Sequence, residues 1–221
     1  MKIKWLGHSA FLITAKDGTR IITDPYKSGS FNGALCYKPI HETADIVTVS
    51  HEHDDHNYVI QIGGKPFVMR NIGTQTVKNI KMEGITTCHD KSRGRERGLN
   101  TVYVMNIDGL KLCHLGDLGH MPTAEETKQI GPVDIMLIPV GGVFTIDAKT
   151  AFQVTETLKP KLVIPMHYKT EGCGFPIAPV DDFLAAAGGK VSIKRVVGSE
   201  IEVDQVTLPR QREIWVLKYE Q

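Results

Sequence analysis

Short apolar runs alternate with polar segments along most of the chain, and many of the runs are rich in valine, isoleucine and threonine. Short β-branched runs that are bounded by turn residues predict strands. Asp17-Gly18 and Asp108-Gly109 indicate hairpin turns between such strands. We therefore expect strands over residues 2–6, 10–14, 20–23, 44–50, 66–69, 85–88, 101–107, 110–115, 134–139, 162–165, 191–197, 201–203 and 213–217.

Fewer segments have a helical pattern, and four of the remaining segments are expected as loops that form the walls of a substrate site. No internal repeat, linker or low-complexity segment divides the chain, so we expect a single domain over residues 1–221. The expected helices cover residues 74–82, 122–130, 150–158 and 180–187, with one or two helical turns over 57–62. The expected loops cover residues 26–43, 90–98, 141–147 and 170–178.

Composition places the chain among ordinary soluble proteins. The hydrophobic content of 41% and the charged content of 23% are typical values for such proteins. A net charge of +1 gives no reason to expect nucleic acid or an anionic membrane as partner. Without a signal-like start or an apolar run of membrane-spanning length, we expect a cytoplasmic protein without a membrane span. The four cysteines form no CxxC pair and are expected to be reduced and mostly buried.

Possible metal ligands are most concentrated in the hexapeptide His51-Glu52-His53-Asp54-Asp55-His56, which follows the apolar run over residues 44–50. Side chains at the carboxyl end of a strand are where α/β folds place their sites. His51 and His53 face the same side in an extended chain and can share one ion. Asp55 and His56 follow a turn and can serve a second ion. A solvated loop that happens to be rich in histidine is the alternative.

Further candidate ligands also follow predicted strands. His89 comes after the strand over 85–88, Asp117 after the strand over 110–115, and His167 after the strand over 162–165. His114 lies three residues before Asp117, so the two side chains point to opposite faces of a strand. We therefore favour His89 over His114 as a ligand. Imidazole and carboxylate donors without thiolate favour zinc, manganese or iron over copper(I).

Other residues keep two interpretations each. His8 is either a turn histidine or part of the rim of the metal site, and Asp24 is either a turn cap or a residue that orients a ligand. The arginines of the loop over 90–98 are either solvated or form a clamp for phosphate or carboxylate. The candidates for that clamp are Arg93, Arg95 and Arg97.

The order of these motifs resembles the metallo-β-lactamase superfamily. The match consists of Asp24, the His-x-His-x-Asp-His motif at 51–56, His89, Gly116-Asp117 and His167 in Ile-Pro-Met-His. Trp-Leu-Gly-His-Ser near the start and the later Pro-Val-Gly-Gly resemble the branch that contains ascorbate-phosphate lactonase and N-acyl-phosphatidylethanolamine phospholipase D.

The resemblance implies an α/β fold, a four-layer αββα sandwich of two mixed β-sheets flanked by helices. It also implies two metal sites that share Asp117 as a bridge, with Asp24 and Asp54 orienting ligands from outside. The first ion would be held by His51, His53 and His89, and the second by Asp55, His56 and His167. Histidine rather than glutamate at position 53 argues against redox iron chemistry, and Asp117 in place of cysteine argues against antibiotic cleavage.

The activity that the resemblance implies is hydrolysis by a hydroxide that two divalent metal ions activate. Asp55 and Asp117 would orient this nucleophile. Zinc is the expected metal, with manganese and iron as alternatives. We expect a small anionic substrate with an ester, lactone or phosphodiester bond, and a homo-oligomer is left open. The alternatives are a phosphodiesterase that acts on lipid or nucleotide, and a non-catalytic metal-binding protein.

Overall fold

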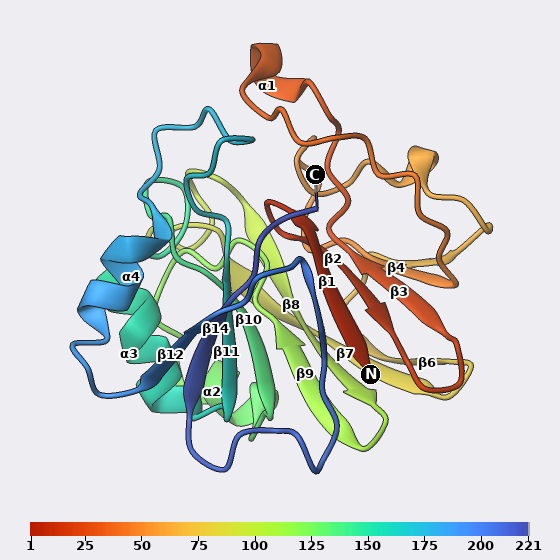
Figure 1. The fold of residues 1–221 in the computed structure, drawn as a ribbon. Helices are drawn as coiled ribbons and strands as arrows, with labels where there is room; N and C mark the ends of the chain where they lie inside the picture. The colour runs from red at the N-terminus through yellow and green to blue at the C-terminus, as the bar shows by residue number, and fades with distance from the viewer. Residues whose placement is uncertain (221) are drawn as a thin grey trace.

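The first five strands of the chain and β13 build a mixed sheet of six strands in the computed structural model, which describes residues 1–220 (Figure 1). Its strand order is β13-β1-β2-β3-β4-β5. Neighbouring strands from β13 to β3 pair antiparallel, whereas those from β3 to β5 pair in parallel. The strands are β1 (Lys2–Gly7), β2 (Ala10–Thr14), β3 (Arg20–Thr23), β4 (Ile46–Thr48), β5 (Phe67–Met69) and β13 (Glu200–Glu202).

The second sheet has eight strands in the order β12-β14-β11-β10-β9-β8-β7-β6. The strands from β12 to β9 pair in parallel, and those from β9 to β6 pair antiparallel. They are β6 (Gly73–Val77), β7 (Ile80–Cys88), β8 (Leu99–Ile107), β9 (Leu110–His114), β10 (Ile135–Pro139), β11 (Leu162–Met166), β12 (Ser192–Arg195) and β14 (Glu213–Val216).

Helices flank the sheets, and α2, α3 and α4 lie along the eight-stranded sheet (Figure 1). The helices are α1 (Ser30–Gly33), α2 (Ala124–Ile130), α3 (Ala148–Leu158), α4 (Val180–Ala186) and the 3-10 turn η1 (Val59–Gln61). The predicted arrangement of two mixed sheets flanked by helices is therefore confirmed. Among residues 1–220, no helix has the length and apolar character needed to cross a membrane. Gln221, the last residue of the predicted single domain, lies outside the described residues.

Both faces of the first sheet are buried, and successive side chains along its strands point alternately to the two faces. Ile21 and Ile46 belong to the larger hydrophobic cluster, which also contains the apolar residues of the second sheet. Their neighbours Ile22 and Val47 point to the other face and pack in a smaller cluster. Apolar residues of the segment over 26–43 cover that second face. The long loop is thus held in place by packing.

The predicted helix over residues 74–82 is wrong. The segment forms β6 and the start of β7, an antiparallel hairpin with a turn at Lys78, whose φ is 51°. Thr74, Thr76 and Val77 are β-branched and suit a strand, and the pairing with β7 decides the conformation. The cysteines are all free, but only Cys113 and Cys173 are buried, whereas Cys36 is exposed.

The cap of α3 allows a test of the fold. The Asp147 carboxylate accepts the backbone N–H of Thr150 at 2.8 Å, and this bond lowers the pKa of Asp147. We expect Asp147→Ala to lower the free energy of unfolding by about 1 kcal/mol at pH 7. A carboxyl with a depressed pKa stabilises above its unfolded pKa, and this contribution is lost as the pH falls through the folded pKa.

The measurement is denaturant unfolding of metal-free protein at several pH values, with Asp147→Asn as the control that keeps an acceptor. The difference between wild type and Asp147→Asn should shrink as the medium becomes acidic. An equal loss for Asp147→Ala and Asp147→Asn at every pH would contradict this account of the cap.

Candidate metal centre

Strand direction gathers the predicted ligands at one rim of the two sheets. In the first sheet, β1, β3 and β4 run the same way, since β2 is antiparallel to both β1 and β3. In the second sheet, β7, β9 and β11 also share one direction. The candidate residues all come shortly after the carboxyl ends of these six strands: His8, Asp24, the segment 51–56, His89, Asp117 and His167.

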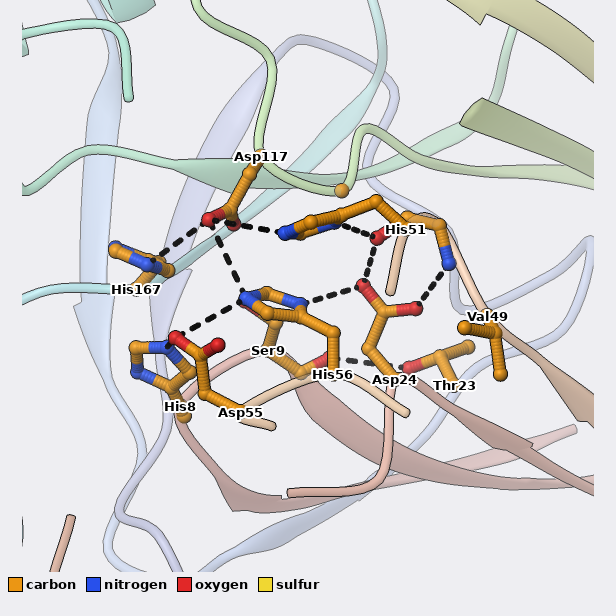
Figure 2. Close-up of polar contacts among 12 residues, drawn as sticks. His8, Ser9, Thr23, Asp24, Val49, His51, Asp55, His56, Asp117 and His167 are labelled. Atoms are coloured by element: carbon orange, nitrogen blue, oxygen red, sulfur yellow. Dashed lines mark hydrogen bonds and ion pairs between the residues drawn. The ribbon is translucent and has the colours of Figure 1, made fainter. Parts of the chain in front are cut away.

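The side chains of the seven predicted ligands lie together and form groups that could hold a metal ion. One group consists of His51, His53 and His89, and its donor atoms lie within 4.8 Å of one another. A second group consists of Asp55, His56 and His167 together with His8, and its donor atoms also lie within 4.8 Å of one another. Figure 2 shows Asp117 between the rings of His51, His56 and His167.

Asp117 joins the two groups. Its Oδ2 atom lies 3.3 Å from Nε2 of each of His56, His89 and His167, and 4.0 Å from Nε2 of His51. The other carboxylate atom, Oδ1, is buried without a hydrogen-bond partner in the described part of the chain. One carboxylate therefore faces imidazoles from both groups, which is the position that a bridging ligand requires.

The centre buries more negative charge than its fixed positive charge can balance. Asp24, Asp55 and Asp117 are all buried, and their ion-pair partners among residues 1–220 are histidines rather than lysine or arginine. Buried carboxylates need a paired cation or several hydrogen bonds. Two divalent cations held by the two groups would supply that charge, so the donor set fits metal ions.

The protonation preferences agree with a cation site. Burial lowers the pKa of His51 to about 3, and repulsion from His56 adds to this shift. Burial opposes charge on Asp55 and Asp117 as well, but nearby imidazoles hold the pKa of both carboxyls well below its usual range. Burial also opposes charge on His56, yet the two carboxylates raise its pKa well above its usual value.

Asp24 orients two of the candidate ligands. Its Oδ2 atom accepts the Nδ1–H of His56 at 2.9 Å and the hydroxyl of Ser50 at 2.6 Å, and its Oδ1 atom accepts the backbone N–H of Ser50. The Ser50 oxygen in turn lies 2.9 Å from Nδ1 of His51. Because the Ser50 proton is directed to Asp24, Nδ1–H of His51 is the donor in that bond. Nε2 of both histidines is left without a hydrogen-bond partner and faces the centre.

Among the residues with two interpretations, His8 belongs to the centre. It is fully buried, and its Nε2 atom lies 3.1 Å from Oδ2 of Asp55. Asp24 likewise orients ligands. The expected role of Asp54 is not supported, because this residue is exposed and its carboxylate bonds to none of the ligands within residues 1–220. His114 uses both nitrogens elsewhere, on the carbonyl of Ser9 and the N–H of Gly116.

Asn100 is a positioning residue that sequence reasoning missed. Its Oδ1 atom accepts the backbone N–H of Asp117 at 2.8 Å, and its Nδ2 atom donates to Thr87 and to the carbonyl of Leu115. The sequence around Asn100 carried no signal for this role, because the bond to Asp117 joins residues 17 positions apart. Gly116 fits against it with a φ of 54°, and a β-carbon there would lie 2.3 Å from Asn100 Oδ1 and 2.7 Å from the Ser50 β-carbon.

Three residues of the centre have left-handed backbone conformations that glycine adopts more readily. The φ angles are 50° for His8, 39° for Asp24 and 50° for His167. Each residue stands where the chain leaves a strand and turns sharply. Such conformations are uncommon for residues with a β-carbon and concentrate at functional sites. Here the turn directs each side chain into the centre.

A cavity of about 270 Å³ opens onto the centre. The four loops that were expected to form substrate walls each contribute one side chain to its lining: Phe31, Arg97, Phe144 and Phe175. The remaining lining residues belong to the centre itself: His53, Asp55, His89 and Asp117. A small molecule in this cavity would contact the candidate ligands directly.

Comparison with known proteins gives the class to which this centre belongs. Residues 2–167 match the family described as the Beta-lactamase superfamily domain, and the chain belongs to that superfamily. The predicted resemblance to metallo-β-lactamase proteins is thereby confirmed, whereas the narrower resemblance to the lactonase and phospholipase D branch stays a prediction.

Particular relatives are described as metal-dependent hydrolases. A UPF0173 metal-dependent hydrolase of Thermococcus onnurineus is 32% identical over 77% of this chain and 85% of its own length. A UPF0173 metal-dependent hydrolase of Thermococcus kodakarensis is 31% identical over 92% of this chain and 95% of its own length. A crystal structure from Thermotoga maritima has a TM-score of 0.81 and 36% identity, and covers 99% of both chains. It is described as a candidate zinc-dependent hydrolase of the metallo-β-lactamase superfamily.

The relay from Asp24 to His51 through Ser50 can be tested by removing one hydroxyl. We expect Ser50→Ala to weaken metal binding by about tenfold to a hundredfold, since residues that orient a ligand have effects of this size. The measurement is competition for zinc against a chelating dye. Thr48→Val is the matched control, because the hydroxyl of Thr48, the last residue of β4, is buried without a hydrogen-bond partner in the described part of the chain. Equal affinity in Ser50→Ala and Thr48→Val would contradict the relay.

The close contact at Gly116 gives a second test. Gly116→Ala combines a left-handed backbone with overlap against Asn100 and Ser50, so we expect a loss of about 2 kcal/mol or more in unfolding free energy and reduced metal content. Gly18→Ala is the control, because its φ is +85° but no atom lies within 4 Å of the added carbon. It should cost only about 1 kcal/mol and keep its metal. Equal behaviour of the two variants would show that the contact is unimportant.

Proposed function

We propose that the protein is a hydrolase that uses two divalent metal ions held at the shared rim of its sheets. The observation that carries this proposal is the pair of donor groups on either side of Asp117, with three buried carboxylates that have no lysine or arginine partner among residues 1–220. The description of the relatives as metal-dependent hydrolases supports it.

The proposed ligand assignment follows the two groups. His51, His53 and His89 would hold the first ion. Asp55, His56 and His167 would hold the second, and Asp117 would serve both. The buried nitrogen and oxygen atoms without partners support this assignment, since they include Nε2 of His51 and His56 and Oδ1 of Asp55 and Asp117. Zinc is the proposed metal, because nitrogen and carboxylate donors in this number suit it.

When bound, the ions would supply Lewis acidity and an acidified water molecule for attack on an ester, lactone or phosphodiester. The residues of the chain prepare that chemistry. Asp55 and Asp117 hold oxygen atoms toward the reacting centre and orient the attacking water. His8 donates its Nε2–H to Asp55 Oδ2, which leaves Oδ1 of the same carboxylate available. Asp24 fixes the ring of His56, and through Ser50 that of His51.

A non-catalytic metal-binding protein is the competing proposal. Such a protein can lose individual ligands without consequence, whereas here all seven predicted ligands come together and a cavity reaches them. The complete set beside an accessible cavity favours catalysis. The small volume of that cavity also favours a small-molecule substrate.

Elemental analysis by plasma mass spectrometry is the decisive experiment. We expect about two metal ions per chain in the wild type. The double variant His51→Ala with Asp117→Ala should lose most of its metal and all turnover of lactone and phosphodiester probes. His41→Ala is the control, an exposed histidine outside the donor groups. A folded wild-type chain that takes up no metal on reconstitution, or a double variant with unchanged activity, would refute the proposal.

A further inference from the structure

The cavity over the metal centre is lined by two chemically different sets of side chains, and both sets constrain the substrate. One set consists of candidate ligands. The other set consists of three phenylalanines and one arginine that come from four separate loops. A cavity of about 270 Å³ lies slightly below the range of roughly 300–1,000 Å³ that encloses drug-sized ligands. The enclosed part of the substrate is therefore small.

The apolar side is an aromatic wall formed by Phe31, Phe144 and Phe175. The ring of Phe175 contacts Phe31 at a centroid distance of 5.2 Å and Phe144 at 5.7 Å, both edge to face. It also lies 5.8 Å from the ring of His8, so the wall continues to the metal centre. Phe31 is 48% exposed although it lines the cavity. An exposed ring in a concave site is suited to an apolar ligand group.

Among residues 1–220, Arg97 is the only lysine or arginine that lines this cavity. Its guanidinium carbon lies 5.7 Å from the centroid of Phe144. Its ion-pair partner is Glu96 at 3.6 Å, and the Glu96 side chain is mostly exposed. A guanidinium with one weak partner at the surface keeps donors free for a carboxylate or phosphate. Arg93 and Arg95, the other predicted clamp residues, are absent from the lining.

The loop that carries Arg97 is held rigidly beside the centre. Asp90 follows His89 directly, and its carboxylate accepts the backbone N–H groups of Ser92, Gly94, Glu96 and Arg97 at 2.7–3.0 Å. The loop also closes by the bond from the N–H of His89 to the carbonyl of Gly98 at 3.1 Å. Arg97 is therefore presented to the cavity from a fixed backbone.

We infer that the substrate is a small organic anion that carries an aromatic or short aliphatic group. This inference rests on the proposed hydrolase function. A carboxylate or phosphate oxygen of the substrate pairs with Arg97, and its apolar group packs against the aromatic wall. The scissile ester or phosphodiester bond lies over Asp55 and Asp117. Water adds across that bond: its oxygen joins the acyl carbon or phosphorus, and the leaving oxygen takes a proton.

The charge requirement is tested with matched substrates on the zinc-loaded protein. The carboxylate probe is mono(4-nitrophenyl) glutarate and its neutral counterpart is 4-nitrophenyl butyrate. The phosphate probe is methyl 4-nitrophenyl phosphate. We expect Arg97→Gln to lower kcat/KM for at least one anionic probe by about tenfold to a hundredfold, mainly through KM, because a charged hydrogen bond is lost. Turnover of the neutral ester should change by less than about threefold, and Arg97→Lys should recover part of the loss.

Arg95→Gln is the control, since Arg95 lies in the same loop but outside the cavity lining. Equal loss for neutral and anionic esters in Arg97→Gln, or no loss for any anionic probe, would overturn the inference while leaving the hydrolase function intact. The arm that responds, carboxylate or phosphate, identifies the anion.

Binding separates failure of the inference from failure of the proposed function. Isothermal titration calorimetry uses 4-phenylbutyrate and phenylphosphonate as unreactive probes. We expect Phe31→Ala to weaken binding of the better probe by about tenfold, and Phe67→Ala, an exposed phenylalanine on β5, to have no effect. Binding that depends on Arg97 and Phe31 without turnover of any ester would support the cavity assignment and refute hydrolysis. Probe affinity that is unchanged by substitution of either Arg97 or Phe31 would overturn the inference.

Discussion

The burial of three carboxylates among imidazoles is the constraint on which the rest of this structure depends. Asp24, Asp55 and Asp117 are buried, and their ion-pair partners among residues 1–220 are all histidines. That arrangement is costly in a low-dielectric interior unless positive charge is brought to it. The surrounding architecture serves this need, because six strands from two sheets direct donors to a single rim.

Hydrogen bonds from uncharged side chains contribute to the order of the centre alongside its ion pairs. The Ser50 hydroxyl donates to Asp24 and accepts from His51, and the Asn100 side chain accepts the backbone N–H of Asp117. Gly116 allows these two supports to approach closely, since a side chain there would overlap both Asn100 and Ser50. Contacts within the chain therefore fix the side chains and backbone of these candidate ligands, as precise coordination requires.

The strands before the candidate ligands were predictable because each contains a short apolar or β-branched run that is followed within a few residues by a histidine or an aspartate. The strands before His51, His89, Asp117 and His167 follow this pattern. The segment over 74–82 was not predictable from its own residues, since its pairing with β7 decides its structure. The partners of His8 and Asn100 were equally out of reach, because they depend on contacts between residues 47 and 17 positions apart. Of three candidate arginines in one loop, only the folded chain distinguishes Arg97.

The left-handed turns at His8, Asp24 and His167 set stability and function against each other. Each of these conformations costs roughly 1 kcal/mol or more relative to glycine. Glycine at any of the three positions would relax the backbone but remove a side chain from the centre. Selection against backbone strain alone would therefore favour glycine at these positions, and only a selection that also demands these side chains would retain them.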